Sequence, residues 1–489
     1  MIVPWSPQTA IVLALVVPAL GVVGIDLASR WPNLREAVTL TASIALLLVV
    51  LSLVPHVLAG EHPSVTLVQM LPGVPLAFRV EPLGMIFAVV ASLLWPINSL
   101  YSIGYMRGNA EHAQTRFYIC FAIALMATMG VAFSANLLTM FVFYEVLTLS
   151  TYPLVAHHED EEARRGARVY LGILLSTSIG LLLPAILWVW NTAGTVEFRA
   201  GGILDGHMSG PTVGILLAMM MFGIGKAALM PVHRWLPAAM VAPTPVSALL
   251  HAVAVVKTGV FAVTKVIVYV FGLDFLRSQP GTGWLLYVAG FTIVAASVVA
   301  LRQDHLKRRL AYSTVSQLSY IVISAALFTP AGVIGAALQI VAHAFGKITL
   351  FFAAGSIHTA AHKDYISDMD GVGRRMPWTM GAFAIGSLSM IGVPLTAGFV
   401  SKWYILGGAV GADQGFMLLV MVASTLLNAG YFLPIVYRAF FRSPGAQAIH
   451  GEAPAPVVCA LVATAGLTLA MFLFPALPLA LAQSIAGGG

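Results

Sequence analysis

Apolar residues fill the chain in long runs that recur from one end to the other. A run of about 18 or more apolar residues is long enough to cross the hydrocarbon core of a bilayer as one helix. The segments between the runs are too short for a soluble domain, so we predict an all-α polytopic membrane protein. About fourteen runs are predicted to span the membrane, and they cover residues 8–28, 36–58, 82–105, 116–134, 136–156, 167–190, 213–232, 243–271, 283–301, 308–328, 331–357, 378–406, 412–441 and 456–485.

Composition and charge favour the same class. Hydrophobic residues make up 59% of the 489 positions and charged residues only 9%, which is more apolar surface than a soluble core needs. If the N-terminus is outside, seventeen Lys and Arg side chains fall in cytoplasmic loops, and only Arg79, Arg199 and Arg277 fall on the opposite side. We therefore expect a multi-pass protein of a bacterial inner or plasma membrane with both termini outside. The net charge of +6 reflects this topology, and no nucleic-acid partner is expected.

The first 29 residues hold no Lys or Arg, so the first span is expected to be retained and not cleaved as a signal.

Five lysines lie inside the apolar runs, where charge is rare, and one glutamate is similarly placed. A charge at the bilayer centre costs at least about 2.5–3.5 kcal/mol, so such residues usually face a wet interior and move ions. The pattern predicts a pathway for protons or monovalent cations. The six residues are Lys226, Lys257, Lys265, Lys347, Lys402 and Glu145.

Two spans, the eighth and the twelfth, carry helix-breaking residues beside a buried lysine. The eighth begins APTPVS ahead of Lys257, and the twelfth reads MIGVPLTAGFVSKWYIL around Lys402. In a membrane such breaks are tolerated mainly where protein or water satisfies the freed backbone groups. Paired broken helices in two halves of a chain indicate transporter sites built from inverted repeats. The alternative is an ordinary proline kink in each span.

Glu145 is the acidic residue that we place well inside a span, and we expect it to pair with Lys226. Burial lowers the proton affinity of a lysine and a nearby carboxylate raises it, so a change in their separation would change the charge of Lys226. A static buried ion pair is the alternative interpretation.

Two histidines lie in spans that also carry a lysine. His343 and Lys347 are four residues apart and share a helix face, so together they are candidates for a proton relay. His251 and Lys257 are six apart, and each is expected to meet a different neighbour. The alternative for each histidine is a satisfied core residue.

The remaining charged positions lie near span ends. We expect Lys265 to extend its ammonium group to the interface, and Lys402 to be the terminal group of the pathway. Asp304, His305 and Lys307 form a short inner loop that is either solvated or an access funnel for protons or cations. The loop HHEDEEARR at 157–165 is interpreted as a solvated helix start, with ion capture as the alternative.

Motifs of other chemistries do not occur in the sequence. There is no GK[ST] phosphate loop, no HExxH, no nucleophile elbow and no CxxC pair. We expect neither a cofactor nor a resident metal, and we expect a transporter subunit with no chemistry of its own.

Four segments together carry a resemblance to known proteins: FYEVLTLSTYPLV, GIGKAALMPVHRWLPAAMVAPTPVSALLHAVAVVKTGVF, HAFGKITLFF and GVPLTAGFVSKWYIL. They resemble the antiporter-like membrane subunits of respiratory complex I, membrane-bound hydrogenases and Mrp-type multisubunit cation/proton antiporters. The resemblance covers about residues 80–442.

The resemblance implies a fourteen-helix fold with two inverted five-helix repeats, discontinuous eighth and twelfth helices, and a hydrated polar axis in the membrane plane. It also implies other membrane subunits as partners. The matching positions are Glu145 and Lys226 as the charged pair, Lys257 in the first broken helix, His343 and Lys347 as the central relay, and Lys402 as the terminal group. The expected division is a three-helix segment at 1–115, five-helix repeats at 116–271 and 283–441, and a C-terminal helix at 456–485.

Within these families, a compact chain with a terminal lysine resembles the D-type component of an Mrp antiporter. The segment APTPVSALLH is closer to the larger subunits, so membership of a redox-driven complex, either an NADH-quinone oxidoreductase or a membrane-bound hydrogenase, stays open. A third hypothesis is a membrane scaffold whose charges only hold helices together.

Overall fold

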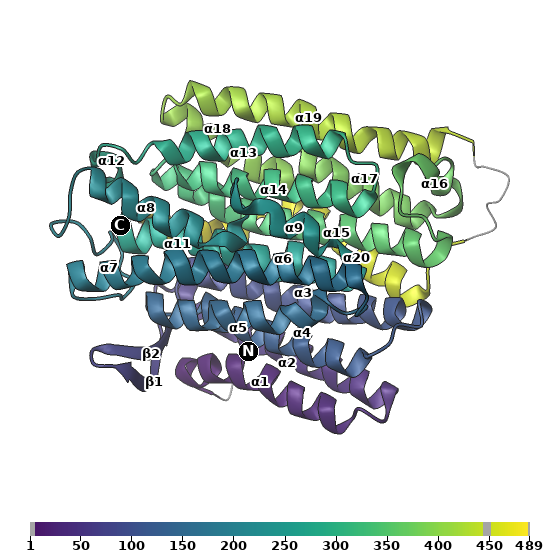
Figure 1. Ribbon diagram of the computed structural model, residues 1–489, viewed down its shortest axis with the longest axis horizontal. Coiled ribbons are helices and arrows are strands. Elements are labelled where there is room, and N and C mark those ends of the chain that lie inside the picture. Colours follow the sequence, from purple (N-terminus) through teal and green to yellow (C-terminus); the bar gives the residue numbers. More distant parts are fainter. Residues whose placement is uncertain (1–4, 444–450, 488–489) are drawn as a thin grey trace.

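The computed structural model describes residues 5–443 and 451–487, and most of them lie in helices that run side by side (Figure 1). Helices α1 (Pro7–Leu27) and α2 (Pro32–Leu58) lie at one end of the row. Helices α18 (Ala397–Gly411) and α19 (Gly415–Phe441) lie at the other end. The predicted class, a helical polytopic membrane protein, is confirmed.

Eleven helices in the described part of the chain are long and apolar enough to cross a bilayer. Two of them contain π-helical turns: α6 (Glu161–Thr177) continues into α7 (Leu183–Ala193), and α10 (Thr244–Ala248) continues into α11 (Val255–Val266). Besides α1, α2 and α19, the others are α3 (Pro82–Gly108), α4 (Gln114–Ala132), α5 (Leu137–Val155), α13 (Trp284–Leu301), α15 (Pro330–Ala361) and α20 (Ala455–Leu473).

The three other expected spans are short or polar, so the count of fourteen stays a prediction. Span 308–328 corresponds to α14 (Leu306–Ala325), which begins with Lys307, Arg308 and Arg309. Span 213–232 holds α8 (Pro211–Gly223), and span 378–406 holds α17 (Pro377–Ile391) and part of α18. The short helices are α9 (Trp235–Ala238), α12 (Leu273–Ser278) and α16 (Val372–Arg375).

A β-hairpin joins α2 to α3, a feature that the sequence analysis did not predict. Strand β1 (Ser64–Leu71) pairs antiparallel with β2 (Val74–Arg79), and it is mostly exposed. In β2, Phe78 is buried and anchors the hairpin on the helices. The hairpin lies beyond the helix ends on one face of the molecule (Figure 1).

Proline marks the beginning of many of these helices, because its missing N–H is not needed in the first turn. Examples are α3 at Pro82, α15 at Pro330 and α17 at Pro377. Side-chain caps begin others: Asn136 accepts from the Thr139 backbone N–H at the start of α5, and Asp160 accepts from Ala163 at the start of α6.

The seventh span is interrupted, which the sequence analysis did not predict. Helix α8 ends at Gly223, and a single 3₁₀ turn (Gly225–Ala227) follows before the chain re-forms short helical turns up to residue 241. A Cβ at Gly225 would clash with the Thr177 hydroxyl oxygen, so a side chain there has no room. The break is therefore built from small residues that allow the chain to leave the helix against α6.

The eighth span is irregular at the place where a break was predicted. In residues 244–271 a π-helical turn at Leu249–Val253 is followed by a bend at Ala254 (φ −118°, ψ −68°) before α11 begins at Val255, and a second π-helical turn covers Ile267–Phe271. Pro245 lies in the first turn of α10, where proline is compatible with a helix, so it begins this span and does not divide it.

The break predicted in the twelfth span is present. Helix α17 ends at Ile391, and α18 begins at Ala397. Gly392 has φ +92°, a left-handed conformation that favours glycine. The observed interruptions are thus in the seventh, eighth and twelfth spans, and the seventh and the twelfth are each the fourth span of their predicted five-helix set.

The predicted C-terminal helix at 456–485 is two helices in the structure. Helix α20 ends at Leu473, and α21 (Ala476–Gly487) follows after a gap that contains Pro475. Proline cannot continue the hydrogen bonding of the preceding helix, which accounts for the division.

Candidate functional site

The five lysines singled out from the sequence are all buried. The side chains of Lys226, Lys257, Lys265 and Lys347 are 0% exposed, and Lys402 is 6% exposed. Each one therefore depends on protein groups for its hydrogen bonds, and those groups define the site.

Lys226 lies in the break of the seventh span and reaches across to α5. Its Nζ donates to the Tyr144 carbonyl oxygen at 2.8 Å and to the Thr148 hydroxyl at 2.5 Å. The Nζ also lies 3.1 Å from the centre of the Tyr144 ring, a cation–π contact. The C-terminal end of α8 is close in sequence, and its dipole favours a positive charge there.

Glu145 is next to this group on α5 but is not in contact with the ammonium. Among the described residues, no ion pair within 4.0 Å joins Glu145 to Lys226, and neither carboxylate oxygen has a hydrogen-bond partner. The structure therefore holds the expected pair in an open arrangement, in which Tyr144 and Thr148 take the place of the carboxylate.

Lys257 and His343 meet between α11 and α15. The Lys257 Nζ lies 2.5 Å from the His343 Nδ1, and both side chains are 0% exposed. An ammonium group can donate a hydrogen bond only to a ring nitrogen that carries no proton. The two nitrogens in this contact therefore share one proton, and the two side chains carry one positive charge and not two. Both residues were predicted to belong to the pathway, but nothing in the sequence indicates that they are in contact.

His251 lies in the π-helical turn of the eighth span, and its environment differs from that of Lys257. Its ring packs against Phe351 with centroids 4.5 Å apart. Neither of its ring nitrogens has a hydrogen-bond partner within the part of the chain that the structure describes.

A hydrogen-bonded connection leads from Lys347 to Lys402. The Lys347 Nζ donates to the Ser313 hydroxyl at 2.7 Å and to the Leu310 carbonyl at 3.1 Å. Tyr431 donates to the same Ser313 oxygen at 3.2 Å and makes a short contact with the Asn428 side-chain oxygen. These contacts lead from α15 through α14 to α19.

The connection ends at the break of the twelfth span. Asn428 donates to the Met390 carbonyl at 3.4 Å, and Lys402 donates to the Met390 and Ile391 carbonyls at 3.1 and 2.7 Å. These carbonyls are at the C-terminus of α17, where they lack helical partners and where the helix dipole favours a cation. A Cβ at Gly392 would lie 2.6 Å from the Lys402 Cδ, so glycine also makes room for the lysine.

Lys265 is buried near one end of its span and is not in contact with solvent. Its Nζ lies 2.5 Å from the Glu81 Oε1 and donates to the Ser134 carbonyl at 2.7 Å. Glu81 precedes the first residue of α3 and its side chain is 9% exposed. Sequence reasoning missed Glu81 because it lies just outside an apolar run, and the acid directly before the Pro82 helix start was the only signal.

A cavity of about 1040 Å³ opens on the face that holds the basic loops, and its lining includes His305, Lys307 and Asp364. Lys307 donates to the Ala242 carbonyl at 2.9 Å. Burial and the charge of Lys307 lower the pKa of His305, so its ring is neutral at pH 7. Two of the three candidate access residues therefore line the cavity.

Asp304, the third candidate, has a structural role. Its carboxylate accepts from the Ser367 backbone N–H at 3.1 Å and from the Ser367 hydroxyl at 2.8 Å, which fixes the loop after α15 against the start of α14.

A second cavity, of about 400 Å³, lies at the opposite ends of the helices. Its lining includes Arg79, Glu81 and Tyr269. Helix α3 runs from this cavity, at Pro82, to the first cavity, at Tyr105. The Glu81–Lys265 pair therefore lies on the face that the charge bias assigns to the outside.

Comparison with known proteins places this architecture in a family. Residues 134–428 match the family described as NADH:quinone oxidoreductase/Mrp antiporter, transmembrane. NADH-quinone oxidoreductase subunit N of Desulforudis audaxviator is 32% identical over 77% of this chain and 75% of its own length. A protein of Rhizobium meliloti named as the probable A/B component of a K⁺/H⁺ antiporter is 31% identical over 82% of this chain, but over only 40% of its own length.

Solved structures show the same fold. A chain of the Mrp complex from a Dietzia species superposes with a TM-score of 0.88 at 21% identity, covering 98% of this chain and 97% of that one. A chain of a membrane-bound sulfane sulfur reductase, an archaeal respiratory complex, gives a TM-score of 0.85 at 22% identity over the same shares. With the family match over more than half of its length, the chain belongs to the NADH:quinone oxidoreductase/Mrp antiporter transmembrane family.

Proposed function

We propose that this chain is the proton-conducting, ion-translocating subunit of a multisubunit monovalent cation/proton antiporter of the Mrp type, in the position of its D-type component. The observation that carries the proposal is the buried contact between Lys257 and His343, with the connection from Lys347 to Lys402 beside it. Buried lysines without carboxylate partners are costly, and proton movement is a function that uses them.

The central step is a proton transfer between Lys257 and His343. With one proton between the two nitrogens, the positive charge belongs either to the ammonium or to the imidazolium. His343 and Lys347 are one helical turn apart, and two like charges at about 6 Å repel by about 3 kcal/mol at an effective dielectric constant of about 20. Charging His343 therefore favours release of a proton from Lys347 toward Lys402.

Lys226 and the three α5 residues around it, Tyr144, Glu145 and Thr148, act as a switch in this proposal. In the open arrangement the Lys226 ammonium is held by Tyr144 and Thr148, while Glu145 lies unpartnered beside it. We propose a closed arrangement in which the ammonium pairs with Glu145. Closing would neutralise the positive field of Lys226 and change how readily Lys257 keeps its proton.

The two cavities provide access from opposite faces in this proposal. Protons or cations would arrive at the basic face through the cavity that holds Lys307, and His251 would pass protons on toward Lys347. The Glu81–Lys265 pair would connect the pathway to the other face. We place that face, and both termini, outside the cell membrane of a bacterium.

The partners we propose are other membrane subunits of a hetero-oligomeric complex, together with Na⁺ or another monovalent cation and protons. The chain would have no chemistry of its own and would bind no cofactor. A superposition that covers 98% of the chain on a chain of a complex described as Mrp supports this assembly.

A second candidate function is the proton-pumping subunit of a redox-driven complex. The observation that favours it is the relative named NADH-quinone oxidoreductase subunit N, which this chain matches over 75% of that protein's length. The residues of the pathway would be the same, and only the energy source would differ. A scaffold role is the third candidate, and it predicts that neutral substitutions impair assembly before transport.

Purification of the tagged chain in mild detergent separates the first two candidates. The antiporter proposal predicts small hydrophobic partner subunits without flavin or iron–sulfur absorbance, and sodium-driven proton flux in proteoliposomes. Flavin or iron–sulfur partners would instead assign the chain to a redox-driven pump.

A further inference from the structure

Two loops on the basic face bring a glutamate and two histidines together. Glu111 and His112 lie in the loop between α3 and α4, and His157 follows the end of α5. One ligand atom from each of the three side chains lies within 4.8 Å of the others. The His157 Nε2 is 3.5 Å from the Glu111 Oε2, and a fourth side chain, His158, has its Nδ1 3.8 Å from the same oxygen.

His157 is buried at the centre of this group, and its close polar neighbour, the Glu111 carboxylate at 3.5 Å, does not form a hydrogen bond with it. Its side chain is 0% exposed, and neither ring nitrogen has a hydrogen-bond partner in the described ranges. The ring packs between His112, with centroids 5.0 Å apart, and Phe117, with centroids 6.1 Å apart. A buried imidazole without a hydrogen bond is costly, and a bound cation at Nε2 would remove that cost.

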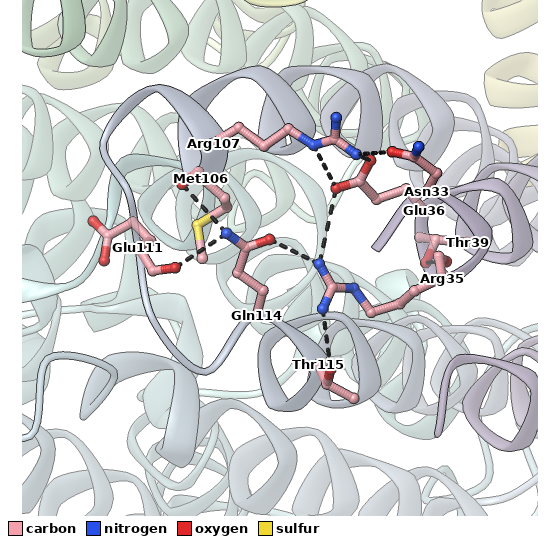
Figure 2. A network of polar contacts seen from close by, with 9 residues as sticks. All are labelled: Asn33, Arg35, Glu36, Thr39, Met106, Arg107, Glu111, Gln114 and Thr115. Atoms are coloured by element: carbon pink, nitrogen blue, oxygen red, sulfur yellow. Dashed lines mark hydrogen bonds and ion pairs between the residues drawn. The ribbon is translucent and has the colours of Figure 1, made fainter. Parts of the chain in front are cut away.

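The loop that carries Glu111 is held in place by the network in Figure 2. Gln114 donates to the Glu111 backbone carbonyl at 3.0 Å, and Arg35 donates to the Gln114 side-chain oxygen at 2.8 Å. Glu36 forms an ion pair with this arginine and another with Arg107. The Glu111 carboxylate points away from the network, so the network fixes the backbone of this residue and leaves the carboxylate beside His157 and His158 (Figure 2).

We propose that Glu111, His112 and His157 form a binding site for a divalent transition-metal ion of the Zn²⁺ type. Two imidazoles and a carboxylate are a ligand set that Zn²⁺ uses, with a fourth position left for water or for His158. Ca²⁺ and Mg²⁺ prefer oxygen ligands only, so the two histidines select against them. No sequence motif predicts the site, because its ligands come from two loops, which explains why the sequence analysis expected no metal.

Glu111 and His158 also line the cavity that contains Lys307. A bound dication would place two positive charges beside the access that the proposed function assigns to this cavity. We therefore expect the metal to slow translocation from the basic face. This second part rests on the proposed function, whereas the binding site does not.

The test uses the purified full-length chain in its native complex. Zn²⁺ affinity is measured by competition with a chromophoric chelator, and Co²⁺ serves as the spectroscopic probe. Parental protein is expected to bind one ion per chain and to give the strong visible absorption of four-coordinate Co²⁺. Glu111→Gln and His112→Ala are expected to weaken Zn²⁺ binding by at least about tenfold. His207→Ala changes an exposed histidine in another loop and is the matched control, with unchanged affinity.

Equal affinity in the parental protein, Glu111→Gln and His112→Ala would overturn the site, as would a Co²⁺ spectrum of the six-coordinate aquo ion. If a variant fails to assemble, X-ray absorption of the Zn²⁺-loaded parental protein decides, because the site requires two histidine nitrogens at about 2.0–2.1 Å. Zn²⁺ binding without slower proton flux in proteoliposomes would overturn the blocking step alone. Absence of flux in metal-free protein would count against the proposed function and not against the site.

Discussion

The Lys257 ammonium nitrogen lies 2.5 Å from the Nδ1 of His343, in a place where neither side chain is exposed. The two residues come from different helices, α11 and α15, and are 86 positions apart in the chain. A second proton would place two positive charges side by side in a buried site, which is unfavourable. The protonation state of the pair therefore depends on the charges of the residues around it. A change in the charge of Lys226 or Lys347 can therefore alter the protonation of the Lys257–His343 pair.

Removing the Ser313 hydroxyl should break the connection between Lys347 and Lys402. Ser313→Ala deletes the acceptor at 2.7 Å from the Lys347 Nζ, and a hydrogen bond to a charged group is worth about 1.5–3 kcal/mol. We expect proton flux to fall by about tenfold or more, measured with a pH-sensitive dye in proteoliposomes. Ser319→Ala is the matched control, because this buried serine of the same helix donates to the Val315 carbonyl of α14 itself. Equal losses in the two variants would mean that Ser313 contributes only to packing.

Thr148 is expected to set the open arrangement of Lys226. Thr148→Val keeps the shape of the side chain but removes the hydroxyl at 2.5 Å from the Lys226 Nζ. The ammonium should then pair with Glu145, and flux should fall by about tenfold, the value of one charged hydrogen bond. Glu145→Gln should also lower flux, since it removes the closed arrangement. Thr128→Val, a buried threonine that bonds within α4, is the control and should transport normally. Parental flux in Thr148→Val would contradict the switch.

Glu81→Gln should destabilise the protein strongly. It leaves the Lys265 ammonium buried without its counter-charge, and breaking a buried pair costs about 3–5 kcal/mol. We expect a clearly lower thermal unfolding temperature in detergent. The double variant Glu81→Gln/Lys265→Met removes both charges and should recover most of the loss. A Glu81→Gln protein as stable as the parent would show that the pair is not needed to keep Lys265 buried.

The pH dependence of stability should show the contribution of Asp364, which lies outside the spans. Its hydrogen bond with His358 lowers the pKa of this carboxyl below its ordinary value of 3.8, although burial acts in the other direction. The ionised form is therefore favoured by folding, and its contribution is present above pH 3.8 and is lost as the pH falls through the lowered pKa. The pair is partly exposed, so the contribution is expected to be under about 1 kcal/mol.

Thermal unfolding of the parental protein and of Asp364→Asn, followed from about pH 6 down to about pH 3, checks this expectation. The difference between them should shrink only below the ordinary carboxyl pKa. A difference that disappears already at about pH 5 would indicate a raised pKa and would contradict the assignment.

The helical membrane fold could be predicted from the sequence because the signal is local. An apolar run in a bilayer must satisfy its own backbone groups, so length and hydropathy alone indicate a helix. The same reasoning identified the buried lysines, since a charge among apolar residues is visible in the sequence.

The location of helix breaks was less predictable, and the reason is the position of proline relative to the helix start. Pro245 looks like a breaker but lies in a first turn, whereas the break at Lys226 depends on the small residues around Gly225. Whether a glycine breaks a helix depends on what packs against it, and that information comes from α6, in another part of the chain.

The partners of the lysines could not be predicted, because they come from distant segments. Lys265 meets Glu81, and Lys226 meets Thr148 and not the neighbouring Glu145. Which residue of a helix turn faces a lysine depends on the rotation of that helix, and hydropathy does not fix this rotation when several faces are apolar.

Cation-driven proton flux through the assembled complex measures whether the Lys257–His343 pair carries protons. The measurement compares the parental protein with His343→Ala and Lys257→Met in proteoliposomes. His207→Ala, a substitution in an exposed loop outside the pathway, controls for effects of mutagenesis and reconstitution. Both pathway variants are expected to assemble with their partners and to lose at least about tenfold in flux, because neither retains the shared proton. Normal assembly with parental flux in His343→Ala and Lys257→Met would contradict this expectation.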